Sequence, residues 1–202
     1  MFRFNSQFKI KITAFFLAIL AFILVSCGEK PNFKNVDITG SKAFAGQFSL
    51  LDSQGKTKTL ADYQGKLVVL FFGYTHCPDV CPITLQEMQT VMVAMGPLAD
   101  RVQVIFVSLD PQRDTPELMA QYPAAFDPRF IGLRPESESA LTQLTKDFKI
   151  YFNRVPGHNP QSYTIDHTAG SYVFDTDGRL RLYIKHGQGP DPIAHDLKQL
   201  LL

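Results

Sequence analysis

Two long apolar runs in the middle of the chain predict the centre of the fold. The run from Leu67 to Phe72 contains no polar residue, and the run from Val102 to Leu109 is interrupted only by Gln103 and Ser108. Apolar runs of this length are typical of strands buried on both faces. Between them, Pro82 to Met95 is predicted to be a helix that opens on a proline, a favourable first helical residue.

The second half of the chain shows weaker but readable patterns. Apolar residues recur at helical spacing from Ser137 to Phe148. The segment Asp175 to Gly178 separates two apolar runs and is a strong hairpin signal. Further elements are expected at the following positions: a short helix opened by Thr115 as its cap, a strand over Phe130–Leu133, a loop over Val155–Thr164, strands over Ser171–Phe174 and Leu180–Ile184, and a helix over Pro192–Leu202.

The order of these elements predicts the fold class. A short N-terminal β-hairpin is expected from Phe44–Leu51 and Thr57–Leu60. Strands that then alternate with helices indicate an α/β domain, with a central mixed β-sheet flanked by helices on both faces. The sequence contains no internal repeat, so residues 42–202 are expected to form one domain.

The first residues have the pattern of a targeting segment. Basic residues precede an apolar run from Ala14 to Val25, which suits a signal peptide and is short for a membrane span. The run ends at Ser26-Cys27, which resembles a bacterial lipobox with Cys27 as the lipidated residue. We therefore expect a signal peptide over 1–27 and a tether over 28–41, and an uncleaved membrane anchor is the alternative. Either places the domain outside the cytoplasm, where disulfides persist.

Composition excludes one class of partner. The chain has 202 residues, a formal net charge of +1 and 45% hydrophobic residues. The hydrophobic fraction is sufficient for a core. The chain shows neither a basic stripe nor a Gly-rich phosphate motif, so nucleic acid is not expected as a partner.

Cys77 and Cys81 carry the most informative chemistry. Their spacing allows them to close a disulfide or to hold one soft metal ion. A disulfide that closes so small a ring gains little from chain entropy, which makes a purely structural bridge the weaker interpretation. Because Cys81 precedes Pro82, we expect it to be the N-cap of the helix and to have the lower thiol pKa. Asp79, between the thiols, either tunes the charge of the site or caps the loop.

His167 is the best candidate for a third ligand. If the strand Ser171–Phe174 runs antiparallel beside Leu67–Phe72, its start lies at the edge that carries the thiols. Asp166 is then expected to orient the imidazole as a hydrogen-bond acceptor. His76 is a weaker candidate, because adjacent residues of an extended segment point in opposite directions. Two thiolates and an imidazole suit copper, as Cu(I) or Cu(II).

Three segments in order resemble the Sco/SenC family of copper proteins. They are Phe71–Pro82 (FFGYTHCPDVCP), Ser108–Pro116 (SLDPQRDTP) and Asp166–Thr168 (DHT). The resemblance implies a thioredoxin-like fold and copper bound by Cys77, Cys81 and His167. It also implies a role in assembling the dinuclear copper centre of cytochrome c oxidase, by copper delivery or by thiol reduction.

Several expectations follow from the resemblance and the residues together. The main hypothesis is a copper metallochaperone rather than an enzyme, anchored at the membrane through its N-terminal lipid, with a redox-active Cys77–Cys81 pair and Asp114 supporting the site. Its expected partners are the copper-A-bearing subunit of the oxidase and an upstream copper chaperone or thioredoxin-like reductase. The alternatives are a thiol–disulfide oxidoreductase, which does not need His167, and a thiol peroxidase.

Overall fold

The structure is a computed structural model that describes residues 31–44, 46–158 and 162–202. The predicted signal peptide, including Cys27, lies outside the described residues. The compact unit runs from Asn32 to Leu202. Within the described residues, none of the helices combines the length and hydrophobicity needed to cross a lipid bilayer.

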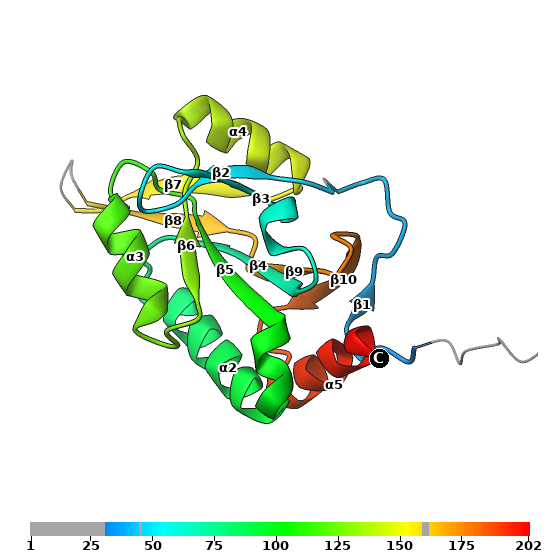
Figure 1. The fold of residues 1–202 in the computed structure, drawn as a ribbon. Coiled ribbons are helices and arrows are strands. Elements are labelled where there is room, and N and C mark those ends of the chain that lie inside the picture. Colours follow the sequence, from blue (N-terminus) through cyan, green and yellow to red (C-terminus); the bar gives the residue numbers. More distant parts are fainter. Residues whose placement is uncertain (1–30, 45, 159–161) are drawn as a thin grey trace, which may run out of the picture. The chain divides into compact units, whose positions relative to one another are not determined.

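A six-stranded mixed sheet forms the centre of this unit (Figure 1). Its strands, in spatial order, are β1 (Val36–Asp37), β10 (Leu180–Lys185), β9 (Gly170–Phe174), β4 (Leu67–Gly73), β5 (Val102–Ser108) and β6 (Ile131–Leu133). The strands β4, β5 and β6 are parallel, whereas β9 runs antiparallel to β4 with Phe71 opposite Ser171. The predicted mixed sheet and the predicted antiparallel pairing of these two strands are confirmed.

Helices cover both faces of the sheet. They are α2 (Val80–Met95), α3 (Pro116–Ala124), α4 (Glu138–Asp147) and α5 (Pro190–Leu201), with 3-10 turns η1 (Leu60–Tyr63) and η2 (Gly96–Arg101). Figure 1 shows α2 and α5 on one face and α4 on the other. Thr115 and Ser137 cap α3 and α4 by accepting bonds from the amides of Leu118 and Ala140.

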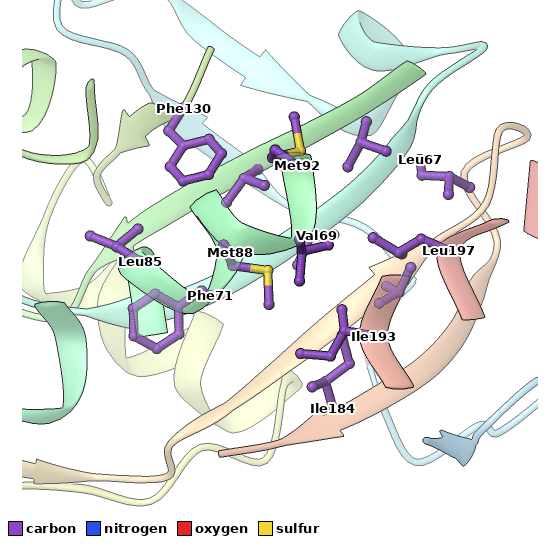
Figure 2. Close-up of a cluster of buried hydrophobic side chains, with 14 of the residues drawn as sticks. Leu67, Val69, Phe71, Leu85, Met88, Met92, Phe130, Ile184, Ile193 and Leu197 are labelled. Atoms are coloured by element: carbon purple, nitrogen blue, oxygen red, sulfur yellow. The ribbon is translucent and has the colours of Figure 1, made fainter. Parts of the chain in front are cut away.

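The strand β4 shows why the sheet needs both layers. All seven of its residues are buried. Because side chains alternate across a strand, Leu67, Val69 and Phe71 pack into the core beneath α2 and α5 (Figure 2). The intervening Val68, Leu70 and Phe72 belong to the second core, beneath α4.

Two small antiparallel hairpins lie outside the main sheet. One joins β2 (Ser49–Leu51) to β3 (Thr57–Thr59), as expected although shorter. The other joins β7 (Phe152–Pro156) to β8 (Tyr163–His167). The predicted loop over 155–164 was therefore wrong at both ends, because Pro156 and Tyr163 form the last pair of this hairpin.

The N-terminal segment of the compact unit also differs from its prediction. Val36 pairs with Tyr183 of β10, and the amides of Lys34 and Asn35 both donate to the buried carboxylate of Asp196. The expected tether over 28–41 is thus part of the fold from at least Lys34. Two residues of strand are too short to give a recognisable hydrophobic pattern.

Gly170 opens β9 where another side chain takes the available space. A Cβ atom built on Gly170 would lie 2.2 Å from the hydroxyl oxygen of Tyr183, which comes from the neighbouring strand β10. Any larger residue at this position would force the Tyr183 ring to move.

Candidate metal centre

The helix α2 begins before its predicted start. Its first residue is Val80, its N-cap is Asp79, and the amide of Ile83 donates to the Asp79 carbonyl at 3.3 Å. The predicted N-cap position of Cys81 was wrong, because Cys81 is the second residue of the helix. Pro82 fits the third position, since the first amides of a helix have no intrahelical acceptor.

The two thiols lie against each other at this helix start. Both are free, and the amide of Cys81 donates to Cys77 Sγ at 3.4 Å. The Cys81 side chain is fully buried, whereas Cys77 is half-buried. A hydrogen bond from Cys81, together with the His167 imidazole and the Asp79 and Cys81 amides, lowers the pKa of Cys77 to about 3 against the effect of burial.

The thiol with the low pKa is thus the opposite of the one predicted. The hydrogen bond to Cys77 and the burial of the thiol raise the pKa of Cys81 far above its usual value. The free amides at a helix N-terminus do stabilise a thiolate, but they do so for Cys77, which sits just outside the helix. Cys81, inside it, is shielded from water. The pair therefore combines one thiolate with one protonated thiol.

His167 ends β8 beside this thiolate. Its ring takes part in a hydrogen bond with Cys77, and its centroid lies 6.2 Å from that of Tyr74 in an edge-to-face arrangement. Its Nδ1 atom lies 3.0 Å from the Thr168 carbonyl oxygen. Since a carbonyl only accepts, Nδ1 carries the hydrogen of that bond, and Nε2 is the ring nitrogen left for another partner. The ring is half-buried.

The three predicted supporting carboxylates have different positions. Asp166 is exposed and lies opposite Asn153 in the β7–β8 hairpin. The Thr168 carbonyl, not Asp166, accepts the hydrogen bond from Nδ1 of the His167 imidazole. Asp79 is exposed and takes the N-cap position of α2. Asp114 is fully buried and accepts from the amide and the hydroxyl of Thr75 at 3.1 and 2.6 Å.

Sequence reasoning missed the contribution of Tyr74. This buried side chain lies between the cysteine loop and the histidine strand, and its hydroxyl accepts from the amide of Ile165 at 3.1 Å. Its position three residues before Cys77, in the first of the three motifs, was the available signal. Burial raises the pKa of Tyr74, so the phenol stays protonated.

The three predicted ligands do not yet form a closed metal site. Within the described residues, no group of three His, Cys, Asp or Glu side chains has an arrangement that could hold a metal ion. The donor types nevertheless fit a soft cation, since the two thiols and the imidazole lie together beyond the end of β4. Closing the set would require the protonated Cys81 thiol to lose its hydrogen and the side chains to shift.

A hollow on the described part of the molecule lies away from these donors. It has a volume of about 710 Å³ and is lined by residues of β2, β3, η1, α4 and the β9–β10 turn. None of the thiols lines it, and the turn at Asp177 lies at the other end of β9 from Gly170. This hollow is therefore separate from the thiols and the imidazole.

Comparison with known proteins gives a consistent picture. The SCO1/SenC family model matches residues 36–202. The SCO2 homologue of cattle is 34% identical over 156 residues, which is 76% of this chain and 58% of that protein. The chain spans a little over half the length of the cattle and human SCO2 proteins.

Solved structures also match this chain. The structure of Bradyrhizobium japonicum ScoI with copper bound matches with a TM-score of 0.70 and 42% identity, over 79% of this chain and all of that one. Yeast Sco1 with copper bound matches with a TM-score of 0.69 and 25% identity, over 77% and 87%. The predicted thioredoxin-like fold is confirmed. With the family model covering nearly the whole compact unit, this chain belongs to the SCO1/SenC family.

Proposed function

We propose that this protein is a copper metallochaperone that binds one copper ion through Cys77, Cys81 and His167. Its role is to deliver the ion to the copper-A-bearing subunit of cytochrome c oxidase. The observation that carries the proposal is the grouping of a thiolate, a second thiol and an imidazole where β4 and β8 end and α2 begins. Two structural relatives, from Bradyrhizobium japonicum at 42% sequence identity and from yeast at 25%, are described as having copper bound.

Each donor has a distinct part in this proposal. Cys77 is deprotonated at neutral pH and half-exposed, so it makes the first contact with an incoming cation. Cys81 loses its proton as the cation replaces that proton between the two sulfurs. His167 offers Nε2, because Nδ1 is held by the Thr168 carbonyl. Release proceeds by stepwise exchange, in which each donor leaves as a thiolate or imidazole of the acceptor arrives.

Oxidation of the thiols would gate the process, because a Cys77–Cys81 disulfide leaves no thiolate to bind copper.

We infer that the domain works outside the cytoplasm, held to the membrane through lipid on Cys27. Support for this comes from the apolar run before Cys27 and from the domain beginning only a few residues after it. Loss of membrane association in Cys27→Ala, with the soluble domain intact, tests the lipid anchor.

A thiol–disulfide oxidoreductase is the second candidate function. The observation in its favour is the pairing of a thiolate of low pKa at Cys77 with a buried, protonated thiol at Cys81. In such a reaction, Cys77 would attack a disulfide of the oxidase subunit and form a mixed disulfide. Cys81 would then lose its proton and displace the reduced thiol, leaving a Cys77–Cys81 disulfide that a thioredoxin-like reductase returns to thiols.

His167→Ala separates the two functions. Loss of a metal ligand should weaken copper binding by more than the ~10–100-fold cost of losing a supporting residue. Anaerobic titration of the reduced protein with Cu(I), against a chromogenic chelator, measures this affinity. Oxidase assembly in cells that carry only the variant should fail. His158→Ala, at an exposed position of the β7–β8 hairpin, is the matched control.

Two results would overturn the copper proposal. One is copper affinity in His167→Ala equal to that of the parent protein. The other is normal oxidase assembly in the variant despite weakened copper binding, which would favour the oxidoreductase because that reaction uses only the two thiols.

A further inference from the structure

Two buried carboxylates stand at the two ends of one turn beside the proposed copper site. The turn follows β5, and the side chains of Asp110 and Asp114 are fully buried in it. The amide of Asp114 donates to the Asp110 carbonyl at 2.9 Å, which closes the turn. The amide of Leu109 donates to the Gly73 carbonyl at 2.7 Å, so the turn begins next to the cysteine loop.

Asp114 holds the cysteine side of the site. Its two oxygens accept from the amide and hydroxyl of Thr75 and from the hydroxyl of Ser108, at 2.5 Å for the last bond. Thr75 lies two residues before Cys77. Asp114 therefore ties the loop that carries Cys77 to the end of β5.

Asp110 holds the histidine side. It accepts from the Tyr163 hydroxyl at 2.7 Å and from Nε of Arg113. The Arg113 guanidinium in turn donates to the Tyr163 carbonyl at 3.0 Å and lies 3.5 Å from the centroid of the Tyr163 ring. Tyr163 is the first residue of β8, and His167 is the last. Three contacts thus join one residue of the histidine strand to one turn.

This attachment matters because the β7–β8 hairpin is a separate two-stranded sheet. Isolated hairpins are marginally stable in water, so their position depends on what holds them. Four residues of strand span about 13 Å, and residues 163 and 167 point to the same face of β8. The position of Tyr163 therefore determines the position of the His167 ring relative to the thiols.

We propose that Tyr163 is a positioning residue for His167, held by the Asp110–Arg113 pair so that the imidazole stays within reach of the two thiols. One rigid turn then sets the separation of the two halves of the site, with Asp114 fixing the thiols and Asp110 fixing the histidine strand. This inference rests on the proposed role of His167 as a copper ligand. It assigns to the turn the task of keeping the copper-free site assembled.

Tyr163→Phe is the sharpest test, because it removes one hydroxyl and keeps the ring beneath the Arg113 guanidinium. We expect Cu(I) affinity to fall by about 10-fold or more, the lower end of the effect of a residue that orients a ligand. In the copper-free protein, the imidazole NMR signals of His167 should shift and broaden. The alkylation rate of Cys77 should change by less than about twofold, since the cysteine side is held by Asp114.

Tyr63→Phe is the matched control. The Tyr63 hydroxyl is buried and has no hydrogen-bond partner among the described residues. Its loss should leave copper affinity and the His167 signals unchanged. Thermal unfolding of both variants shows that any effect of Tyr163→Phe is not a general loss of structure.

A double-mutant cycle with His167→Ala makes the test decisive. If Tyr163 acts through the imidazole, Tyr163→Phe should have no further effect on copper affinity in the His167→Ala background. An equal effect in both backgrounds, or unchanged affinity and NMR signals in the single variant, overturns the positioning role. Copper affinity that is insensitive to His167→Ala overturns the proposed ligand set instead, so the two failures are distinguishable.

Discussion

The two halves of the candidate metal centre are built in different ways. The half that carries Cys77 and Cys81 is supported by β4 and α2. All seven residues of β4 are buried, and the inner face of α2 packs into the core shown in Figure 2. The histidine half stands on β8, where only Ile165 is buried. The proposed function of holding and releasing a cation gains from this division, because one half is packed into the core and the other depends on a few contacts from one turn. The following predictions test the difference.

The largest effect is expected from the core beneath the thiols. Leu85 lies one helical turn after Cys81 and is fully buried. Truncation in Leu85→Ala should lower the free energy of unfolding by about 2–5 kcal/mol, measured by urea denaturation. Val93→Ala, on the exposed face of the same helix, should change it by less than about 0.5 kcal/mol. Equal effects of the two substitutions would show that the inner face of α2 contributes no more to stability than its exposed face.

The second prediction concerns the reactivity of the two thiols. Because the pKa of Cys77 is about 3, its thiolate is fully formed above about pH 5. Alkylation of Cys77 by iodoacetamide should therefore be nearly independent of pH between about 5 and 8 and should slow only below about pH 4. An unperturbed thiol would react about tenfold faster with each pH unit up to its ordinary pKa of about 8.5. Peptide mapping should find the label on Cys77 rather than Cys81.

A smaller effect is expected where a strand approaches Cys81. A Cβ atom at Gly73 would lie 2.7 Å from Cys81 Sγ and 2.7 Å from the Phe106 ring. Gly73→Ala should cost about 1–3 kcal/mol of unfolding free energy by overpacking and should alter the alkylation rate of Cys77. Gly46→Ala, with open space around its Cβ position, is the matched control. Wild-type stability in Gly73→Ala would mean that the thiols are not tightly packed.

The smallest effect is expected at Asp166. Its side chain is exposed, and the Thr168 carbonyl accepts at the imidazole nitrogen that Asp166 was expected to orient. Asp166→Ala should change copper affinity by less than about twofold. A loss of about 10–100-fold would instead show that Asp166 supports the ligand once copper is bound.

Much of the fold was predictable because its signals are local. The unbroken run in β4, the turn at Asp175–Gly178 and the cap at Thr115 each specify an element without reference to distant residues. The approach of His167 to Cys77 followed from one inferred pairing, β9 against β4, which the structure confirms.

The errors share a different cause. The strand β1 is two residues long and is fixed by Asp196, 161 residues away from Asn35. The β7–β8 hairpin is fixed by Asp110 and Arg113, and its prolines and glycine are typical of a loop. The reversed order of the thiol pKa values depends on the hydrogen bond between the two thiols and on the burial of Cys81, which no local pattern reports. Elements held mainly by remote side chains are not visible in hydrophobic periodicity.

The contact between Gly170 and Tyr183 couples the residue types that these two positions can accept during evolution. As long as the phenol ring of Tyr183 fills the volume beside Gly170, a larger residue at 170 requires that ring to move. A small residue at 183 would release that constraint. Across relatives of this protein, the two positions should therefore covary, and a Gly170→Ala substitution that harms the native chain should be tolerated once the aromatic ring opposite it has been removed.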